Sequence, residues 1–400
     1  MSAPARTIEN VNAPSVAPLR RAIVLPFDPV LVFATLCLGI CSLVTIAHAT
    51  KTNIPGDPNY YVTRQGVYFA VGLVLAAALS RMDYSRLREM TWGLYGFLLL
   101  SIVAVYGLGS VAKGAQRAIT FGPFSYQPSE LGKLLLCVVL AGFLTSRSRR
   151  LGEPGTTIRT LALALFPAAL VVAQPDLGSG MVYGAIVLAA LFVAGAPARH
   201  FAALGGVFLV CVTLAFVVAP MGGVHVLHGY QADRLTSFLH PSDKVSATAY
   251  QQVQSVIAIG SGEKTGRGAA ATQTQLDFLP ESHTDFIFAV VGETWGFAGA
   301  AVVLALYAML IWRGMRAIVL AKNLFGAILA GGIVAMLMFQ VAINVGMTIG
   351  IMPITGIPLP LMSYGGSSVI TTLLAVGLLQ SILAQARVSA ALKGRLHSNL

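Results

Sequence analysis

The stretch FLPESHTDFIFAVVGETWG, at 278–296, places ionisable side chains at the entrance of an apolar segment. Asp285 is the last ionisable residue before Phe286, so we expect it at the boundary between water and apolar surroundings. Partial removal from water raises the pKa of a carboxylate towards the range that is useful for a general base, whereas a neighbouring cation opposes that shift. Asp285 is therefore the candidate catalytic residue.

Three further ionisable residues accompany Asp285. Pro280 suits the first turn of a helix, and a helix that begins there would place Glu281 and Asp285 on one face. Glu281 and His283 then allow two interpretations, as polar residues at a helix start or as neighbours of Asp285 in a site. Glu293 lies inside the apolar segment, and the sequence assigns it no role.

A second group lies in KGAQRAITFGPFSYQPSELGKLLL, at 113–136. Lys133 stands about one turn inside an apolar helix, where an ammonium group needs an anionic partner, either a protein carboxylate or a substrate phosphate. Glu130 suits the positive end of that helix and could pair with Lys133, or it could belong to a site. Arg117, in the preceding loop, is a second candidate cation.

Three other segments carry single candidates. Asp176 in QPDLGSG, at 174–180, is either a turn or cap residue or a carboxylate partner for Lys133 or Arg117. Arg234 in GYQADRLTSFLHP, at 229–241, either forms a surface pair with its neighbour or contacts a phosphate. Ser363 in GIMPITGIPLPLMSYGGSS, at 350–368, either offers a hydroxyl to a site or belongs to a packed loop, because so many prolines and glycines predict irregular backbone.

The elements that must position these residues are membrane helices. Hydrophobic residues make up 56% of the 400 residues and charged residues only 10%, which is typical of a multi-pass membrane protein. A hydropathy window of roughly 19 residues predicts ten spans. They are expected near 28–49, 62–81, 91–111, 128–145, 158–174, 178–195, 202–221, 286–312, 324–348 and 364–385.

The basic residues set the expected orientation. They cluster in the segments that share a side with the N-terminus, so the positive-inside rule predicts cytoplasmic tails at 1–27 and 386–400. The membrane domain is then 28–385, with one large extracytoplasmic loop at 222–285, and the polar segments described above face outward together. The +11 net charge is accounted for by these topology signals, so we expect no nucleic-acid partner.

Read together, these segments resemble the SEDS family (shape, elongation, division and sporulation), and its RodA branch more than FtsW. The resemblance rests on KGAQRAI, FSYQPSELGKLLL, QPDLGSG, YQADRLTSFLHP, YQQVQSVIAIGSG, TQLDFLPESHTDFIFAVVGETWGFAG and NVGMTIGIMPITGIPLPLMSYGGSS, which occur in the family's order. It implies an all-α SEDS fold of about ten transmembrane helices in the bacterial cytoplasmic (inner) membrane, with the active site facing outward.

The resemblance also implies a function. A protein of this family would be an inverting peptidoglycan glycosyltransferase that polymerises lipid II, an undecaprenyl-diphosphate-linked disaccharide peptide, for cell elongation and rod shape. Its catalytic aspartate falls on Asp285, and the resemblance carries a role in contacting the substrate or shaping the site to Arg117, Glu130, Lys133, Asp176 and Arg234. A divalent cation, Mg²⁺ or Mn²⁺, is a candidate cofactor that would share the charge of the leaving diphosphate, and the sequence assigns no ligands to it.

The expected partners are a class B penicillin-binding protein, which is a transpeptidase, and the elongation machinery. Two other functions stay open at this point: a flippase that transports lipid II, and a scaffold that only positions the transpeptidase. An FtsW-like septal polymerase is the alternative within the enzyme class.

Overall fold

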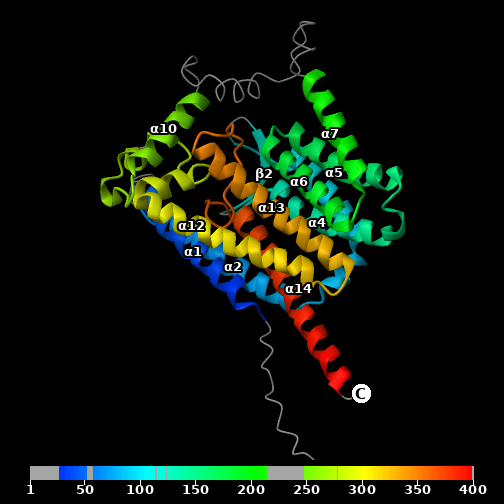
Figure 1. Ribbon diagram of the computed structural model, residues 1–400. Helices are drawn as coiled ribbons and strands as arrows, with labels where there is room; N and C mark the ends of the chain where they lie inside the picture. Colours follow the sequence, from blue (N-terminus) through cyan, green and yellow to red (C-terminus); the bar gives the residue numbers. More distant parts are fainter. Residues whose placement is uncertain are drawn as a thin grey trace, which may run out of the picture.

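The computed structural model describes residues 27–51, 57–112, 115–122, 124–214, 247–276 and 278–398. Within them, nine helices are long and apolar enough to cross a membrane, which confirms the predicted helical membrane architecture (Figure 1). These helices are α1 (Pro29–Ala49), α2 (Tyr60–Arg81), α3 (Thr91–Leu108), α4 (Pro128–Ser146), α5 (Pro154–Ala173), α6 (Leu177–Ala194), α12 (Ile287–Leu320), α13 (Leu324–Thr348) and α14 (Gly366–Ser398).

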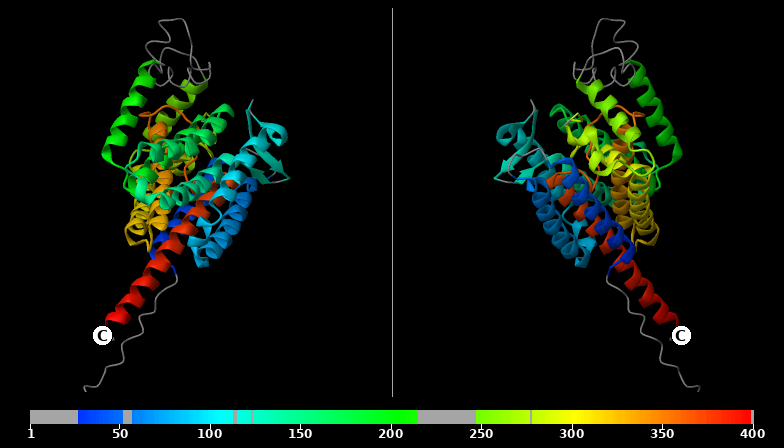
Figure 2. Two further views of the ribbon diagram at one scale, coloured as in Figure 1. Left: turned by 90° about the vertical axis from the view of Figure 1, so that its right-hand side faces the viewer. Right: turned by 90° about the vertical axis from the view of Figure 1, so that its left-hand side faces the viewer.

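The tenth predicted span, 202–221, is matched only in part. Helix α7 (Ala198–Thr213) is apolar but shorter than the other nine, and residues 215–221 lie outside the described part of the chain. Two other boundaries also differ from the prediction. Helix α12 continues beyond residue 312 to Leu320, and α14 continues to Ser398, so most of the expected C-terminal tail is helical and projects from the bundle (Figure 2).

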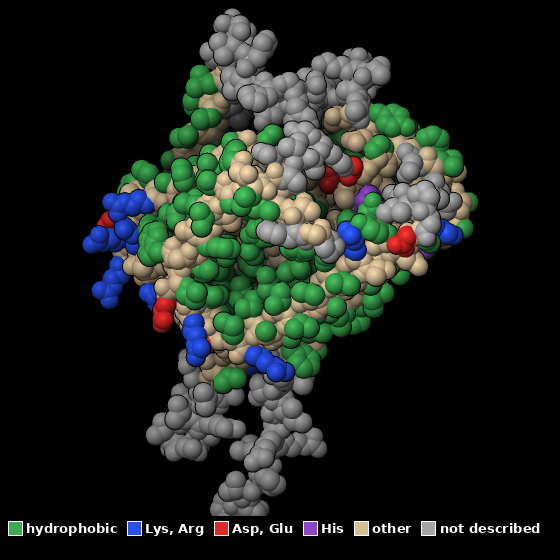
Figure 3. Space-filling view, turned by 180° about the vertical axis from the view of Figure 1, so that it is seen from behind, with side chains coloured by type: hydrophobic (Ala, Val, Ile, Leu, Met, Phe, Trp, Pro, Cys, Tyr) green, Lys and Arg blue, Asp and Glu red, His purple; other side chains and the backbone are tan. Residues whose placement is uncertain are grey.

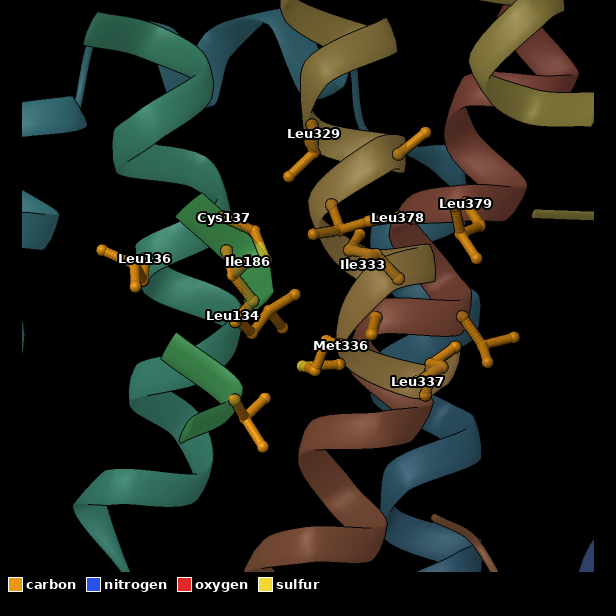
Figure 4. Close-up of a cluster of buried hydrophobic side chains, with 14 of the residues drawn as sticks. Leu134, Leu136, Cys137, Ile186, Leu329, Ile333, Met336, Leu337, Leu378 and Leu379 are labelled. Atoms are coloured by element: carbon orange, nitrogen blue, oxygen red, sulfur yellow. The ribbon is translucent and has the colours of Figure 1, made fainter. Parts of the chain in front are cut away.

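Helices α4, α13 and α14 form the centre of the bundle. About four fifths of each apolar window is buried, 78% for α4 and α13 and 83% for α14. Leucine, isoleucine and methionine side chains from these helices and from α6 interdigitate there (Figure 4). The outer helices α2 and α3 instead have only 22% and 28% of their apolar windows buried, and Figure 3 shows hydrophobic side chains over the middle of one face with Lys and Arg at its edges. This distribution suits a surface that meets lipid.

One end of the bundle is held by a buried carboxylate. Asp28 caps α1 by accepting a hydrogen bond from the Leu31 amide, and its carboxylate also binds the guanidinium groups of Arg313 on α12 and Arg387 on α14. The backbone of Asp28 exchanges hydrogen bonds with the Gln380 amide. The start of α1 and the C-terminal part of α14 therefore lie on the same side of the molecule.

The loop expected at 111–128 contains a small antiparallel sheet that the sequence reasoning did not foresee. Strand β1 (Ser110–Ala112) pairs with β2 (Ala115–Phe121), which pairs with β3 (Phe124–Tyr126). Gly122 turns the chain between β2 and β3 with φ of 57°, a conformation that favours glycine. The sheet leads directly into α4 and so fixes where that helix begins.

Residues 247–276 and 278–286 form a cap over the opposite end, made of α10 (Ala247–Ser261), a short 3-10 turn η4 (Gly268–Ala270) and α11 (Thr272–Gln275). The cap enters a break in α12 at Gly296, where φ is 64° and ψ is −160°. The Glu263 and Lys264 carbonyls accept hydrogen bonds from the Phe297 and Ala298 amides at 2.9 and 3.1 Å, so the break leaves these donors satisfied.

Glu293, which the sequence left unassigned, holds this cap in place. Its side chain is fully buried, and it accepts hydrogen bonds from the Gln273 and Thr274 amides at 2.8 and 3.0 Å and from the Thr274 hydroxyl. A carboxylate at the start of α11 suits the positive end of a helix. Glu293 therefore attaches the cap to α12.

Candidate active site

Asp285 lies in a turn that precedes α12, and the predicted helix start at Pro280 is wrong. Residues 281–286 are turns, and the helix begins at Ile287. Glu281 has a φ of 59°, which no residue in a right-handed helix adopts. Its carbonyl accepts hydrogen bonds from the Thr284 and Phe286 amides, each at 3.2 Å, and its carboxylate accepts one from the Thr284 hydroxyl at 2.9 Å. Glu281 therefore closes the turn and does not share a helix face with Asp285.

Three successive carbonyl groups of this turn are held from outside it. The His283 carbonyl accepts from the Tyr364 amide at 2.9 Å, and the Thr284 carbonyl accepts from the Ser363 hydroxyl at 2.5 Å. The Asp285 carbonyl accepts from the side-chain amide of Asn344, on α13, at 2.9 Å. The backbone that carries the Asp285 carboxylate is thus fixed residue by residue.

The irregular segment 349–365 supplies two of these donors and is itself braced. Ser363 is buried, and its oxygen also accepts a hydrogen bond from the Leu359 amide at 2.8 Å. Asn344 donates a second hydrogen bond to the Ile357 carbonyl at 2.8 Å. The prediction that this proline- and glycine-rich segment is irregular backbone is confirmed, and Ser363 joins it to the turn around Asp285.

His283 lies among aromatic rings. Its ring centroid is 4.7 Å from that of Tyr61, on α2, and 5.8 Å from that of Tyr364. Burial, with a smaller effect of Tyr68, raises the pKa of Tyr364 to about 12, so this phenol stays protonated and neutral at physiological pH. His283 is therefore positioned by contacts with these two rings, which are tilted by 50° and 54° to its own, and like Glu281 it lies in the same turn as Asp285.

Lys133 and Glu130 form a second cluster, on the first turns of α4. Both are buried, and the Lys133 ammonium lies 2.6 Å from the Glu130 carboxylate. Of the two partners that the sequence allowed, the protein carboxylate is the one present. An ion pair taken out of water in this way needs both members, because either one alone would leave an uncompensated buried charge.

Asp176 joins α6 to α4. It caps α6 by accepting a hydrogen bond from the Ser179 amide at 3.1 Å, and it accepts two more from Ser129 at 3.0 Å and Gln127 at 3.3 Å. No ion pair links Asp176 to Lys133 or Arg117 within the described residues. The contacts therefore support the interpretation of Asp176 as a helix cap.

Arg117, on β2, reaches the same corner. Its Nη2 donates to the Pro175 carbonyl at 2.5 Å, next to Asp176, while its Nε is buried without a hydrogen-bond partner. A guanidinium group with an unused buried donor is suited to an anion that approaches this corner. Arg234 lies outside the described residues.

Segment 349–365 and the residues after it connect the two clusters. Gly178, at the start of α6, lies against the Thr355 carbonyl and the Ile357 side chain. The Ile357 carbonyl is also one of the two that accept a hydrogen bond from Asn344. Ser367, at the start of α14, donates to the Ser125 carbonyl of β3 at 2.8 Å and accepts from the Gln127 amide at 2.9 Å. The predicted candidates thus lie in two groups around one irregular segment, one in the Asp285 turn and the other where β2, α4 and α6 meet.

Sequence reasoning missed Asn344, which touches both the turn and the irregular segment. Its signal was a carboxamide in an apolar helix, one of two there with Gln340, since a buried amide needs hydrogen-bond partners. Within the described part of the chain, no three His, Cys, Asp or Glu side chains gather around one point, so no site there would hold a divalent cation by such side chains alone. Asp285 and Glu281 alone do not make a metal site held by protein ligands.

Comparisons with known proteins agree with this architecture. Residues 27–388 match the family model of FtsW, RodA and SpoVE, described as "Cell cycle protein". A probable peptidoglycan glycosyltransferase FtsW of Thioalkalivibrio sulfidiphilus is 38% identical, over 87% of this chain and 86% of its own. The peptidoglycan glycosyltransferase MrdB of Escherichia coli K12 is 37% identical, over 89% of this chain and 93% of its own.

Solved structures show the same fold. A chain from a peptidoglycan synthase complex that coordinates polymerization and crosslinking superposes with a TM-score of 0.77 at 31% identity, covering 90% of this chain and 99% of that one. The crystal structure of Thermus thermophilus rod shape determining protein RodA gives a TM-score of 0.66 at 30% identity, covering 91% of this chain and 98% of that one. The chain is therefore a multi-pass membrane protein that belongs to the FtsW, RodA and SpoVE family, the SEDS proteins.

Proposed function

We propose that this protein is a peptidoglycan glycosyltransferase that polymerises lipid II, with Asp285 as its general base. The proposal rests on the turn at 281–286, because hydrogen bonds from α13 and from segment 349–365 hold the backbone that carries the Asp285 carboxylate. A general base must be held in position before its proton transfer can be efficient. The type of reaction, glycosyl transfer to peptidoglycan, is taken from the names of the relatives.

The reaction would be a single displacement. The Asp285 carboxylate takes the proton from the 4-hydroxyl group of the acceptor sugar, and that oxygen attacks the anomeric carbon of the donor sugar. The bond between this carbon and the phosphate oxygen breaks, and the electron pair leaves with the polyprenyl diphosphate. Because attack and departure occur on opposite faces of the sugar, the anomeric configuration inverts.

Cations would stabilise the leaving diphosphate. Arg117 is the best placed of the described candidates, because its Nε is buried and has no hydrogen-bond partner. Lys133 is neutralised by Glu130, so it would shape the site through that pair, while Arg234 stays a proposal from the sequence alone. We assign a divalent cation no step in this reaction, and Mg²⁺ or Mn²⁺ stays a prediction to be tested by metal depletion.

We also propose how the protein is oriented in the membrane, which cellular role it has and which protein it acts with. Both termini would face the cytoplasm of a bacterial cell and the Asp285 turn would face outward, as the basic residues predict. The role in elongation rests on the resemblance to RodA, since the FtsW and MrdB relatives are similarly close at 38% and 37% identity. The synthase complex that shares the fold favours a crosslinking partner, which we propose is a class B penicillin-binding protein acting with the elongation machinery.

Lipid II polymerisation by the purified protein, with and without that partner, tests the proposal. Removing a general base slows a reaction by about 10²–10⁴-fold, so Asp285→Asn should lose polymerisation by that factor. Asp57→Asn is the matched control, because Asp57 is exposed and precedes α2, and it should retain activity. Near-normal polymerisation by Asp285→Asn would reject the assignment.

A lipid II transporter is the competing function, because buried charges such as the Glu130–Lys133 pair are common in transporters. It predicts that liposomes containing the protein scramble lipid II faster than empty ones, and that Asp285→Asn leaves polymer synthesis unaffected. A scaffold without activity of its own predicts that Asp285→Asn supports normal cell shape and growth.

A further inference from the structure

A narrow groove opens between α1, α2 and α14, at the end of the bundle where Asp28 lies. Its volume is about 330 Å³, which is at the small end of the range for ligand pockets in proteins. The groove belongs neither to the Asp285 turn nor to the Glu130–Lys133 cluster, since none of its lining residues comes from those segments. It therefore needs an explanation of its own.

The lining changes from polar to apolar along the groove. Ser80, Arg81 and Gln380 line one end, and Leu36, Leu73 and Leu373 are among the apolar residues of the remainder. Leu73 precedes Arg81 by eight residues on α2, and Leu373 precedes Gln380 by seven on α14. At 1.5 Å per residue, the apolar part extends about 10–12 Å from the polar end. The groove is thus an elongated apolar slot with a polar mouth.

The mouth carries an uncompensated positive charge. Arg81 is exposed and forms no ion pair within the described part of the chain. Gln380 is occupied by the backbone of Asp28, and the Asp28 carboxylate is already shared by Arg313 and Arg387. One carboxylate between two guanidinium groups leaves that neighbouring cluster cationic as well.

We propose that this groove binds one anionic phospholipid, with an acyl chain in the apolar slot and the headgroup phosphate at Arg81. A phosphate is the natural partner of an unpaired guanidinium group, and the slot lies along helices whose outer surfaces are apolar. With the orientation proposed above, Arg81 is at the cytoplasmic end of α2, so the lipid comes from the inner leaflet, whose anionic headgroups attract basic residues.

The other occupant within reach is the chain's own N-terminal segment, because Phe27 lines the mouth. Its charge argues against it. Residues 1–26 contain three arginines, at 6, 20 and 21, and one acidic residue, Glu9. This basic segment would be repelled by Arg81, whereas the same arginines would strengthen the attraction of an anionic lipid.

Native mass spectrometry of the purified full-length protein tests the proposal. The protein in detergent is titrated with phosphatidylglycerol and, separately, with phosphatidylcholine of the same acyl chains. One basic residue near an anionic headgroup strengthens binding about fivefold, so we expect the wild type to bind one phosphatidylglycerol about fivefold more tightly than phosphatidylcholine. Arg81→Gln should abolish that preference.

Two further variants locate the site. Arg316→Gln, which removes an exposed arginine from the corresponding part of α12, is the matched control and should keep the preference. Ala77→Phe places a ring in the slot and should weaken binding of both lipids; if it fails to fold, the two arginine variants decide alone. The proposal is overturned if Arg81→Gln keeps the preference or if Arg316→Gln loses it equally. Deleting residues 1–25 should not strengthen binding, and a gain would identify the N-terminal segment as the occupant. None of these measurements depends on polymerisation.

Discussion

Replacing Asn344 with leucine removes one side-chain amide from the centre of the bundle and keeps the side-chain size. Asn344 is fully buried on α13, and its Nδ2 donates to the Asp285 carbonyl at 2.9 Å and to the Ile357 carbonyl at 2.8 Å. Asn344→Leu therefore leaves two backbone acceptors without this donor. One of them belongs to the residue that we assign as general base.

The size of the effect follows from these two contacts. A buried acceptor that loses its donor costs about 1–3 kcal/mol, or about 2–6 kcal/mol for two. The loss is partly offset because the Asn344 Oδ1, which is buried without a partner, is removed as well. We therefore expect a loss of folding stability of about 2–4 kcal/mol. A displacement of about 1 Å in a catalytic group costs about 10²-fold in rate, so kcat should fall by about that factor.

Steady-state lipid II polymerisation separates positioning from general destabilisation. A positioning role lowers kcat and leaves KM for lipid II nearly unchanged. Thr157→Val is the matched control, because it removes a buried hydrogen bond of 2.7 Å to His200, between α5 and α7, remote from the Asp285 turn. It should lower Tm and leave kcat unaffected. If Asn344→Leu lowers Tm as the control does and keeps kcat within about threefold of the wild type, Asn344 has no positioning role.

The conservative variant Asn344→Asp adds an independent readout. A carboxylate cannot donate to the two carbonyl groups, and its charge would lie beside the Asp285 backbone. A nearby like charge favours the protonated form of a carboxylate, so the acidic limb of the pH–rate profile should move to higher pH. A variant that affected packing alone would lower the rate and leave the profile in place.

Three further outcomes are expected elsewhere in the molecule. Burial alone would raise the pKa of Asp28, but its hydrogen bonds with Arg313 and Leu31 and the charges of Arg313 and Arg387 together lower it. The Asp28 carboxylate therefore stabilises the fold above a pH of about 4, and this stabilisation is lost as the pH falls through the lowered pKa. Asp28→Asn should accordingly lower Tm at pH 7 and lower it much less at pH 3. Glu293→Gln should loosen the cap, seen as faster hydrogen exchange of the Gln273 and Thr274 amides, and unchanged exchange there would show that the carboxylate does not hold α11. Lys133→Met should destabilise by about 3–5 kcal/mol by leaving Glu130 unpaired, and adding Glu130→Leu should restore Tm but not polymerisation; restored polymerisation would make the pair purely structural.

Much of the fold could be predicted because lipid imposes simple rules. Long apolar runs reveal helices, and a proline in the first turn, such as Pro128 of α4, marks where one begins. The break in α12 could not be placed, because Gly296 is one glycine among 41 and its φ depends on the cap that enters there. The sheet of residues 110–126 was missed because strands of three and seven residues give too little alternation to stand out beside a membrane span.

Several candidate residues lie together as the sequence predicted, although the local backbone that holds them differs from the prediction. Asp285, Glu281, His283 and Ser363 do meet, but the expected helix from Pro280 does not form. The sequence offered a local rule, a proline followed by acidic residues, and tertiary contacts overrode it. Asp176 likewise followed the local rule of a helix cap, although its bonds to Ser129 and Gln127 depend on how α4 and α6 pack.

The failure of that helix prediction has a physical meaning for catalysis. A carboxylate one turn inside a helix would point along the helix surface, whereas Asp285 stands just before α12, whose cap residue Phe286 makes no side-chain cap. A general base must be held in position to accept a proton efficiently, and this turn places Asp285 directly before the cap residue of α12. The turn that achieves this contains Glu281 at a φ of 59°, and the facing segment contains Leu361 at 66°. Non-glycine residues in this region cost of order 1–3 kcal/mol each and persist where surrounding contacts enforce them. Bonds from Asn344, Ser363 and Tyr364 provide that enforcement, so the same contacts that oppose the local helix also hold the base in place.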